Sequence, residues 1–150
     1  MAHWLDLARA NAALIAILAP LVGAALALVA PRGRIACFVA MIAALIASAA
    51  ACDLAWRALY LGASAPVAES GLALRLDGIG VAAGALITVV GALIAFASPA
   101  LSGRGRITPL AAALLMLAQA GWTGVAYAGD LLSLLLAIEL GSLAICGLAA

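Results

Sequence analysis

The chain of 150 residues is too apolar to fold as a soluble domain. Hydrophobic residues make up 69% of it and charged residues only 9%, whereas roughly a quarter of the residues in soluble domains are charged. The net charge of +1, with seven arginines and no lysine, is too small and too dispersed for a nucleic-acid surface. Composition therefore predicts an all-α, polytopic membrane protein surrounded by a lipid bilayer, and it excludes nucleic-acid binding.

Five apolar segments are each long enough to cross a hydrocarbon layer of roughly 30 Å as a helix. Pro31 ends the first, Ser98 and Pro99 end the third, and Asp130 opens the fifth. Between the second and third, residues 62–78 are polar and turn-rich, which predicts a short hairpin outside the membrane. We predict a single transmembrane domain over residues 1–150, with spans at about 11–30, 35–55, 79–97, 109–127 and 130–149.

The positions of the arginines predict the orientation, because cations concentrate in cytoplasmic loops. The loops after the first and third spans contain Arg32, Arg34, Arg104 and Arg106. We therefore expect an inner (cytoplasmic) membrane of the bacterial type, with the N-terminus outside and the C-terminus in the cytoplasm. This orientation brings four aromatic residues to the outer interface, where such residues form a belt: Trp4, Trp56, Tyr60 and Tyr127.

One carboxylic acid lies deep within an apolar span. Glu139 follows Asp130 by nine residues, which places it roughly 13 Å down the fifth span and near the bilayer midplane. An acidic side chain at this depth costs roughly 2.5 to 3.5 kcal/mol, and such residues usually mark a proton or ion path. Glu139 is therefore the main candidate for a functional residue. The alternative is a protonated, hydrogen-bonded carboxyl that only ties helices together.

Two neutral polar residues lie at about the same depth, and a third lies one turn below. Gln119 and Thr88 fall roughly 12 and 13 Å down the fourth and third spans, and Ser142 follows Glu139 by about one turn. If these spans pack together, the three residues can hydrogen-bond the Glu139 carboxyl and begin a polar relay. Neutral polar residues also serve as simple interhelical contacts, so this alternative stays open.

The other charged residues and the cysteines predict structural roles. Asp53 and Arg57 have the (i, i+4) spacing of a helical ion pair, and Asp77 and Asp130 precede helices as caps. The cysteines, which lack the spacing of a zinc site, are Cys37, Cys52 and Cys146. The sequence contains no catalytic triad, phosphate-binding loop or histidine pair, so we expect no cofactor and no catalysis by this chain alone.

Two motifs, residues 128–143 (AGDLLSLLLAIELGSL) and residues 74–79 (LRLDGI), have counterparts in a known family. The first resembles the fifth-helix signature of the antiporter-like subunits of respiratory complex I and Mrp-type cation/proton antiporters. The second is similar to the same family's entry into its third helix, after an outside hairpin. The resemblance covers nearly the whole chain as five N-terminal helices, and it implies a proton-path role for Glu139.

The chain also departs from that family. There the central glutamate pairs with a lysine two helices later, and a second, inverted bundle completes the path. This chain contains no lysine and ends after the fifth span. Either another polypeptide supplies the remainder, or the chain is a shortened accessory subunit, or it is a fragment.

The resemblance and the interior carboxyl together predict a subunit of a complex I-like or Mrp-like complex that translocates protons, or exchanges sodium for protons. The expected partners are other membrane subunits, one of which matches the charge of Glu139. Any redox chemistry of a proton-pumping oxidoreductase would belong to those subunits. The alternatives are a structural or assembly subunit without ion conduction, and a stand-alone small proton-coupled exporter.

Overall fold

The computed structural model describes residues 11–60, 74–102 and 108–149, and of residues 99–102 only the backbone. These ranges form five helices and contain no strand: α2 (Ala12–Val29), α3 (Gly33–Tyr60), α4 (Gly78–Ser102), α5 (Pro109–Tyr127) and α6 (Leu131–Ala149). All five are long and apolar enough to cross a membrane, so the prediction of an all-α polytopic membrane protein is confirmed. Most of the predicted hairpin, residues 62–73, lies outside the described ranges. So do Trp4, Arg104 and Arg106.

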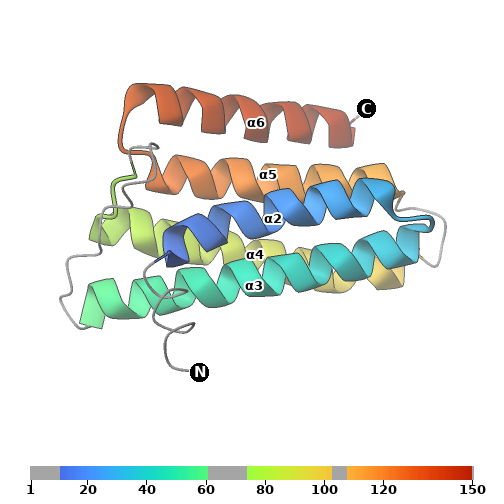
Figure 1. The fold of residues 1–150 in the computed structure, drawn as a ribbon, viewed down its shortest axis with the longest axis horizontal. Helices are drawn as coiled ribbons and strands as arrows, with labels where there is room; N and C mark the ends of the chain where they lie inside the picture. Colours follow the sequence, from blue (N-terminus) through green and yellow to red (C-terminus); the bar gives the residue numbers. More distant parts are fainter. Residues whose placement is uncertain (1–10, 61–73, 103–107, 150) are drawn as a thin grey trace.

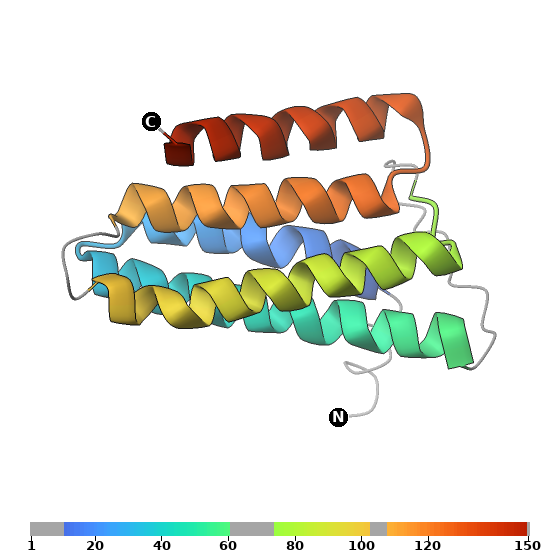
Figure 2. The same ribbon diagram turned by 180° about the vertical axis from the view of Figure 1, so that it is seen from behind.

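Four helices form a bundle, and α6 lies outside it (Figure 1). In the bundle, α2 packs on α3, α3 on α4, α4 on α5 and α5 on α2, which closes a ring. α6 packs extensively against α5 alone among the described helices. Both ribbon views show it at the edge of the molecule beside α5 (Figures 1 and 2).

The core of the bundle consists mainly of alanine. On α3, the fully buried Ala40, Ala44, Ala47 and Ala51 recur every three or four residues and so share one helical face. Small side chains let helix backbones approach closely, and in a bilayer such close packing holds helices together. The larger apolar residues, such as Phe38 and Leu93, are exposed where lipid is expected.

Two helices are longer than predicted. α4 continues through Pro99 to Ser102, past the predicted span end at about residue 97. Pro99 has no N–H for the carbonyl of Ala95, and the Ser98 hydroxyl donates to that carbonyl instead, at 2.7 Å. α3 continues to Tyr60, with 28 residues or about 42 Å, which exceeds the hydrocarbon thickness.

The extra turns of α3 contain polar and aromatic residues that suit a membrane interface. The Arg57 Nη2 and Asp53 Oδ2 atoms are 2.7 Å apart, which confirms the predicted ion pair. Trp56 and Tyr60 are exposed and stack with ring centroids 4.3 Å apart. Tyr127 lies at the same end of the bundle, but its ring is fully buried and so does not face the lipid as a belt residue would.

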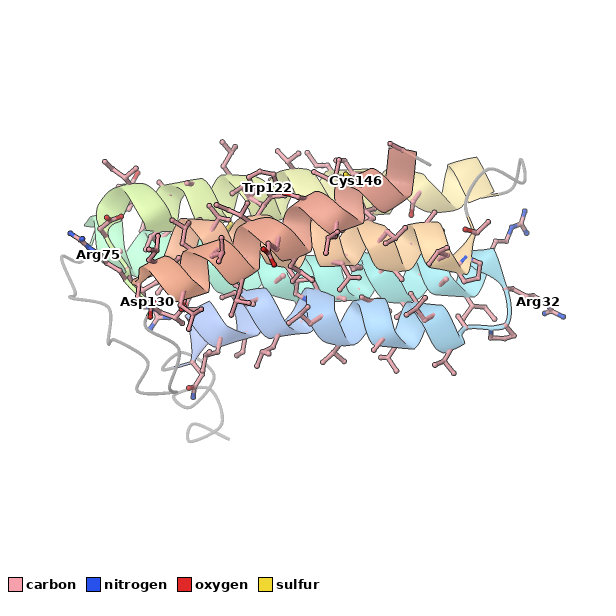
Figure 3. All side chains as sticks on the ribbon, turned by 90° about the horizontal axis from the view of Figure 1, so that it is seen from above. Arg32, Arg75, Trp122, Asp130 and Cys146 are labelled. Atoms are coloured by element: carbon pink, nitrogen blue, oxygen red, sulfur yellow. The ribbon has the colours of Figure 1, made fainter. Side chains whose placement is uncertain are left out.

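The helices begin and end at two opposite ends of the molecule, which Figure 3 marks by Arg32 at one end and Asp130 at the other. At the Asp130 end, Asp77 Oδ1 accepts from the Gly80 N–H and Asp130 Oδ1 from the Ser133 N–H, both at 2.6 Å. The two predicted caps are therefore confirmed. The hydrogen bond from the Ser133 backbone holds the pKa of Asp130 below its ordinary value.

Candidate functional site

Polar side chains meet inside the bundle, between α4 and α5. Thr88 on α4 and Thr123 on α5 are fully buried, and Gln119 on α5 is 5% exposed. The Gln119 Nε2 atom donates to the backbone carbonyl of Thr88 at 3.5 Å. The structure therefore brings together two of the predicted site residues, Thr88 and Gln119. We call Thr88, Gln119, Thr123 and Tyr127 the polar seam.

Glycines of α4 make room for the larger side chains of this seam. A Cβ atom on Gly91 would lie 2.6 Å from the Gln119 Cδ atom, and one on Gly84 would collide with the Tyr127 ring. Gly84, Thr88 and Gly91 follow one another by four and three residues, so they share a face of α4. That face receives the side chains that α5 presents at positions 119, 123 and 127.

The hydrogen bonds of the seam are mostly local. The Thr88 hydroxyl donates to the carbonyls of Gly84 and Ala85, at 3.0 and 2.9 Å, and the Thr123 hydroxyl donates to the Gln119 carbonyl at 2.8 Å. The Gln119 Oε1 atom and the Tyr127 hydroxyl are buried without a hydrogen-bond partner. The seam is therefore a row of separate polar groups and not a continuous hydrogen-bonded relay.

A surface groove of about 360 Å³ runs along α4 and α5 beside the seam. Gln119 and Trp122 contribute to its wall, and the remaining lining residues are aliphatic or glycine. The buried Oε1 atom of Gln119 is not accessible from this groove. The groove therefore presents an apolar surface to whatever occupies the membrane next to it.

Glu139 lies on the outer face of α6, away from the bundle. A Cβ on Gly121 of α5 would lie 2.5 Å from the Gly141 nitrogen and 2.9 Å from the Ala137 carbonyl oxygen, so α6 turns these two residues toward α5. Glu139 is two residues from each, which rotates it by about 200° around the helix, to the opposite side. Accordingly, Glu139 is exposed and makes no hydrogen bond or ion pair within the described part of the chain.

Ser142 lies on the same outer face and is also exposed. On α5, Gln119 is about 200° from Gly121, so the α5 backbone stands between Gln119 and α6. The structure thus corrects the expected grouping: Thr88 and Gln119 lie inside the bundle, away from the Glu139 carboxyl, and Ser142 shares the outer face but makes no hydrogen bond with it. Equal depth was inferred from residue counts, but depth does not determine which way a side chain points.

The sequence reasoning missed Thr123 and the burial of Tyr127. A signal was present, since residues 119, 123 and 127 recur every four residues and therefore share a face of α5. Tyr127 was instead assigned to the aromatic belt because it lies at a span end. Among the described residues, no group of three histidine, cysteine, aspartate or glutamate side chains is placed to hold a metal ion.

Comparison with protein-family models, with curated proteins and with solved structures finds no match to this chain.

Proposed function

We propose that this chain is a subunit of a complex I-like or Mrp-like membrane assembly that translocates protons or exchanges sodium for protons. In this proposal Glu139 belongs to the ion path, at a contact between α6 and a partner subunit. The observation that carries the proposal is the position of Glu139: midway along an apolar helix, on the face opposite α5, with no partner in the described part of the chain.

A partner at this position is favoured because a carboxyl that faces lipid is energetically costly. An acidic residue at the centre of a span costs roughly 2.5 to 3.5 kcal/mol, and the cost falls when a neighbouring helix or a hydrated cavity supplies a hydrogen-bond donor or a cation. No donor or cation in the described part of this chain is paired with the Glu139 carboxyl. A partner helix with a basic or amide side chain at the same depth meets this need.

The polar seam has a separate place in the proposal. Thr88 and Gln119 lie inside the bundle, and α5 separates them from α6. Their contribution to the path, together with that of Ser142 on the outer face, stays a prediction. If they contribute, ions or water must pass between the seam and Glu139 around α5.

The substitution Glu139→Gln tests the proposal, because it keeps the side-chain size and removes the titratable proton. Asp53→Asn is the matched control, since Asp53 is paired with Arg57 on α3 and has no place in the proposed path. We expect both variants to assemble with the same subunits, and only Glu139→Gln to lower ion translocation in reconstituted vesicles, by an order of magnitude or more. Normal translocation by an assembled Glu139→Gln complex would contradict the proposal and favour a structural subunit.

A further inference from the structure

Few residues of α6 are buried in its lateral contact with α5. Only Gly141 and Ala144 of α6 are buried, and Gly141 lies backbone to backbone with Gly121. Helix register is normally fixed by side chains of one helix that insert between those of the next. In this contact such side chains come from α5: Trp122 packs against Gly141 and Leu114 against Gly147. The first turn of α6 lies outside these two contacts.

The first turn of α6 is held from a different direction. Residues Leu74–Asp77, which we call the strap, precede α4 and cross the short link between α5 and α6. Leu74 pairs with Ala128 as in an antiparallel sheet, and the Arg75 N–H donates to the Tyr127 carbonyl at 3.0 Å. The Leu74 side chain is 5% exposed and packs in the same core cluster as Tyr127.

The strap is itself anchored to the bundle. Asp77 caps α4 through the Gly80 N–H, and its carbonyl accepts from the Val81 N–H at 2.9 Å. At Gly80, α4 lies so close to α5 that an added Cβ would be 2.5 Å from the Ala126 carbonyl oxygen. Only Ala128, Gly129 and Asp130 separate this anchored junction from the first residue of α6.

We infer that the strap sets the depth and rotation of α6, and thereby the depth at which Glu139 lies in the membrane. A helix rises by about 1.5 Å per residue as a stiff rod, so a displacement of its first turn moves Glu139 by the same amount. Leu74 and the backbone N–H of Arg75 are then positioning elements for a carboxyl that they do not touch. This inference concerns geometry alone, so it stands or falls independently of ion translocation.

The test compares Arg75→Pro with Arg75→Ala. Proline removes the N–H that bonds Tyr127, whereas alanine keeps that N–H. Both variants remove the exposed Arg75 side chain and its 4.0 Å ion pair with Asp77, so this loss is matched between them. A spin label is placed at Leu143, on the exposed side of α6, or at Leu93, on the exposed side of α4, after the three native cysteines are replaced by alanine. The depth of each label in lipid bilayers is then measured from its accessibility to oxygen and to a water-soluble nickel complex.

We expect Arg75→Pro to shift or broaden the depth of the Leu143 label by up to about one helical turn, roughly 5 Å. The Leu93 label in the same variant, and both labels in Arg75→Ala, should keep the parent depth. Unchanged depth of the Leu143 label in folded Arg75→Pro would overturn the inference, as would an equal shift of the Leu93 label.

If Arg75→Pro does not fold, Leu74→Ala replaces it, because this variant keeps the strap's backbone bonds and removes its buried side chain. The expected result is a smaller shift of the Leu143 label, with the Leu93 label unmoved. A Leu143 label at the parent depth in folded Leu74→Ala would overturn the inference in that case.

Discussion

The four-helix bundle and α6 have similarly apolar sequences but very different packing. In the 18-residue apolar stretch of each helix, between 33% and 50% of the residues of α2 to α5 are buried within the chain, against 11% in α6. Contacts inside the chain therefore explain why the bundle helices have faces of small residues. They bury little of α6, so most of its apolar surface has no packing partner in the described part of the chain. Glu139, a carboxyl midway along its helix, belongs to the helix with the smallest buried share among those described.

The two regions also differ in the state of their polar groups. In the bundle, polar groups are enclosed, and two atoms, Gln119 Oε1 and the Tyr127 hydroxyl, lack a partner. On α6, Glu139 and Ser142 face outward, where a neighbouring molecule can reach them. Substitutions in the bundle should therefore change mainly stability, whereas substitutions on the outer face of α6 should change mainly assembly or transport.

The largest stability effect is expected at the joint between the two regions. Gly121→Ala places a Cβ atom 2.5 Å from the Gly141 nitrogen, and backbone cannot yield as a side chain can. We expect the free energy of unfolding in mixed micelles, followed by circular dichroism, to fall by about 1–3 kcal/mol. Gly78→Ala is the control, because its Cβ meets only Leu59 at 3.7 Å. Equal stability of the two variants would show that α6 is not seated closely on α5.

Inside the bundle, Tyr127→Phe should stabilise the protein. The hydroxyl is buried without a partner, so its removal ends a desolvation penalty and leaves the ring packing on Gly84 intact. We expect the free energy of unfolding to rise by about 1 kcal/mol. A decrease of similar size in the same measurement would mean that the hydroxyl has a hydrogen-bond partner in the bilayer, and that the bundle interior contains a polar group or water beside it.

A smaller change in stability is expected for Gln119→Leu. This substitution loses one long hydrogen bond of 3.5 Å to Thr88 but also removes the unpartnered Oε1 atom. The two effects oppose each other, so the free energy of unfolding should change by less than about 1 kcal/mol. A much larger loss of stability would identify Gln119 as a structural tie between α4 and α5, and would weaken its assignment to an ion path.

The most local effect is expected for Asp130→Ala, which removes the cap from α6 alone. Hydrogen exchange of the Ser133 amide should become faster, while the Gly80 amide, capped by Asp77 on α4, keeps its rate. Because the pKa of Asp130 is lowered in the folded state, the charged cap stabilises the protein above the ordinary aspartate pKa. In the parent this stabilisation should disappear as the pH falls through the lowered pKa. Equal Ser133 exchange rates in variant and parent would contradict a capping role.

The features that sequence predicted correctly are those decided by neighbouring residues. The five helices follow from apolar length and from breakers such as Pro31, and the caps at Asp77 and Asp130 follow from residue type at a helix start. The Asp53–Arg57 pair follows from spacing along one helix. In each case the residues responsible lie within about one helical turn of each other, so they can be identified from a single sequence.

The features that sequence did not predict depend on contacts between helices, or on a side chain that replaces a missing backbone hydrogen bond. Pro99 is a helix breaker by type, yet the Ser98 hydroxyl replaces the missing donor and α4 continues. Tyr127 is an interfacial residue by type, yet a glycine on α4 makes a buried space for it. For Glu139, residue counts give a depth. The direction of its side chain depends on the close contact between Gly121 of α5 and Gly141 of α6, which decides which face of α6 turns toward α5.

The most direct test of the account is photo-crosslinking in native membranes from two positions, Leu135 on α6 and Leu93 on α4, each replaced by benzoylphenylalanine. Both side chains are exposed, and Leu135 lies one turn before Glu139 on the outer face of α6. We predict that Leu135 forms an adduct with a co-purifying membrane subunit that carries a basic or amide residue at the matching depth, while Leu93 forms mainly lipid adducts. Lipid adducts alone at Leu135, in membranes that support ion translocation, would contradict the claim that a partner covers Glu139.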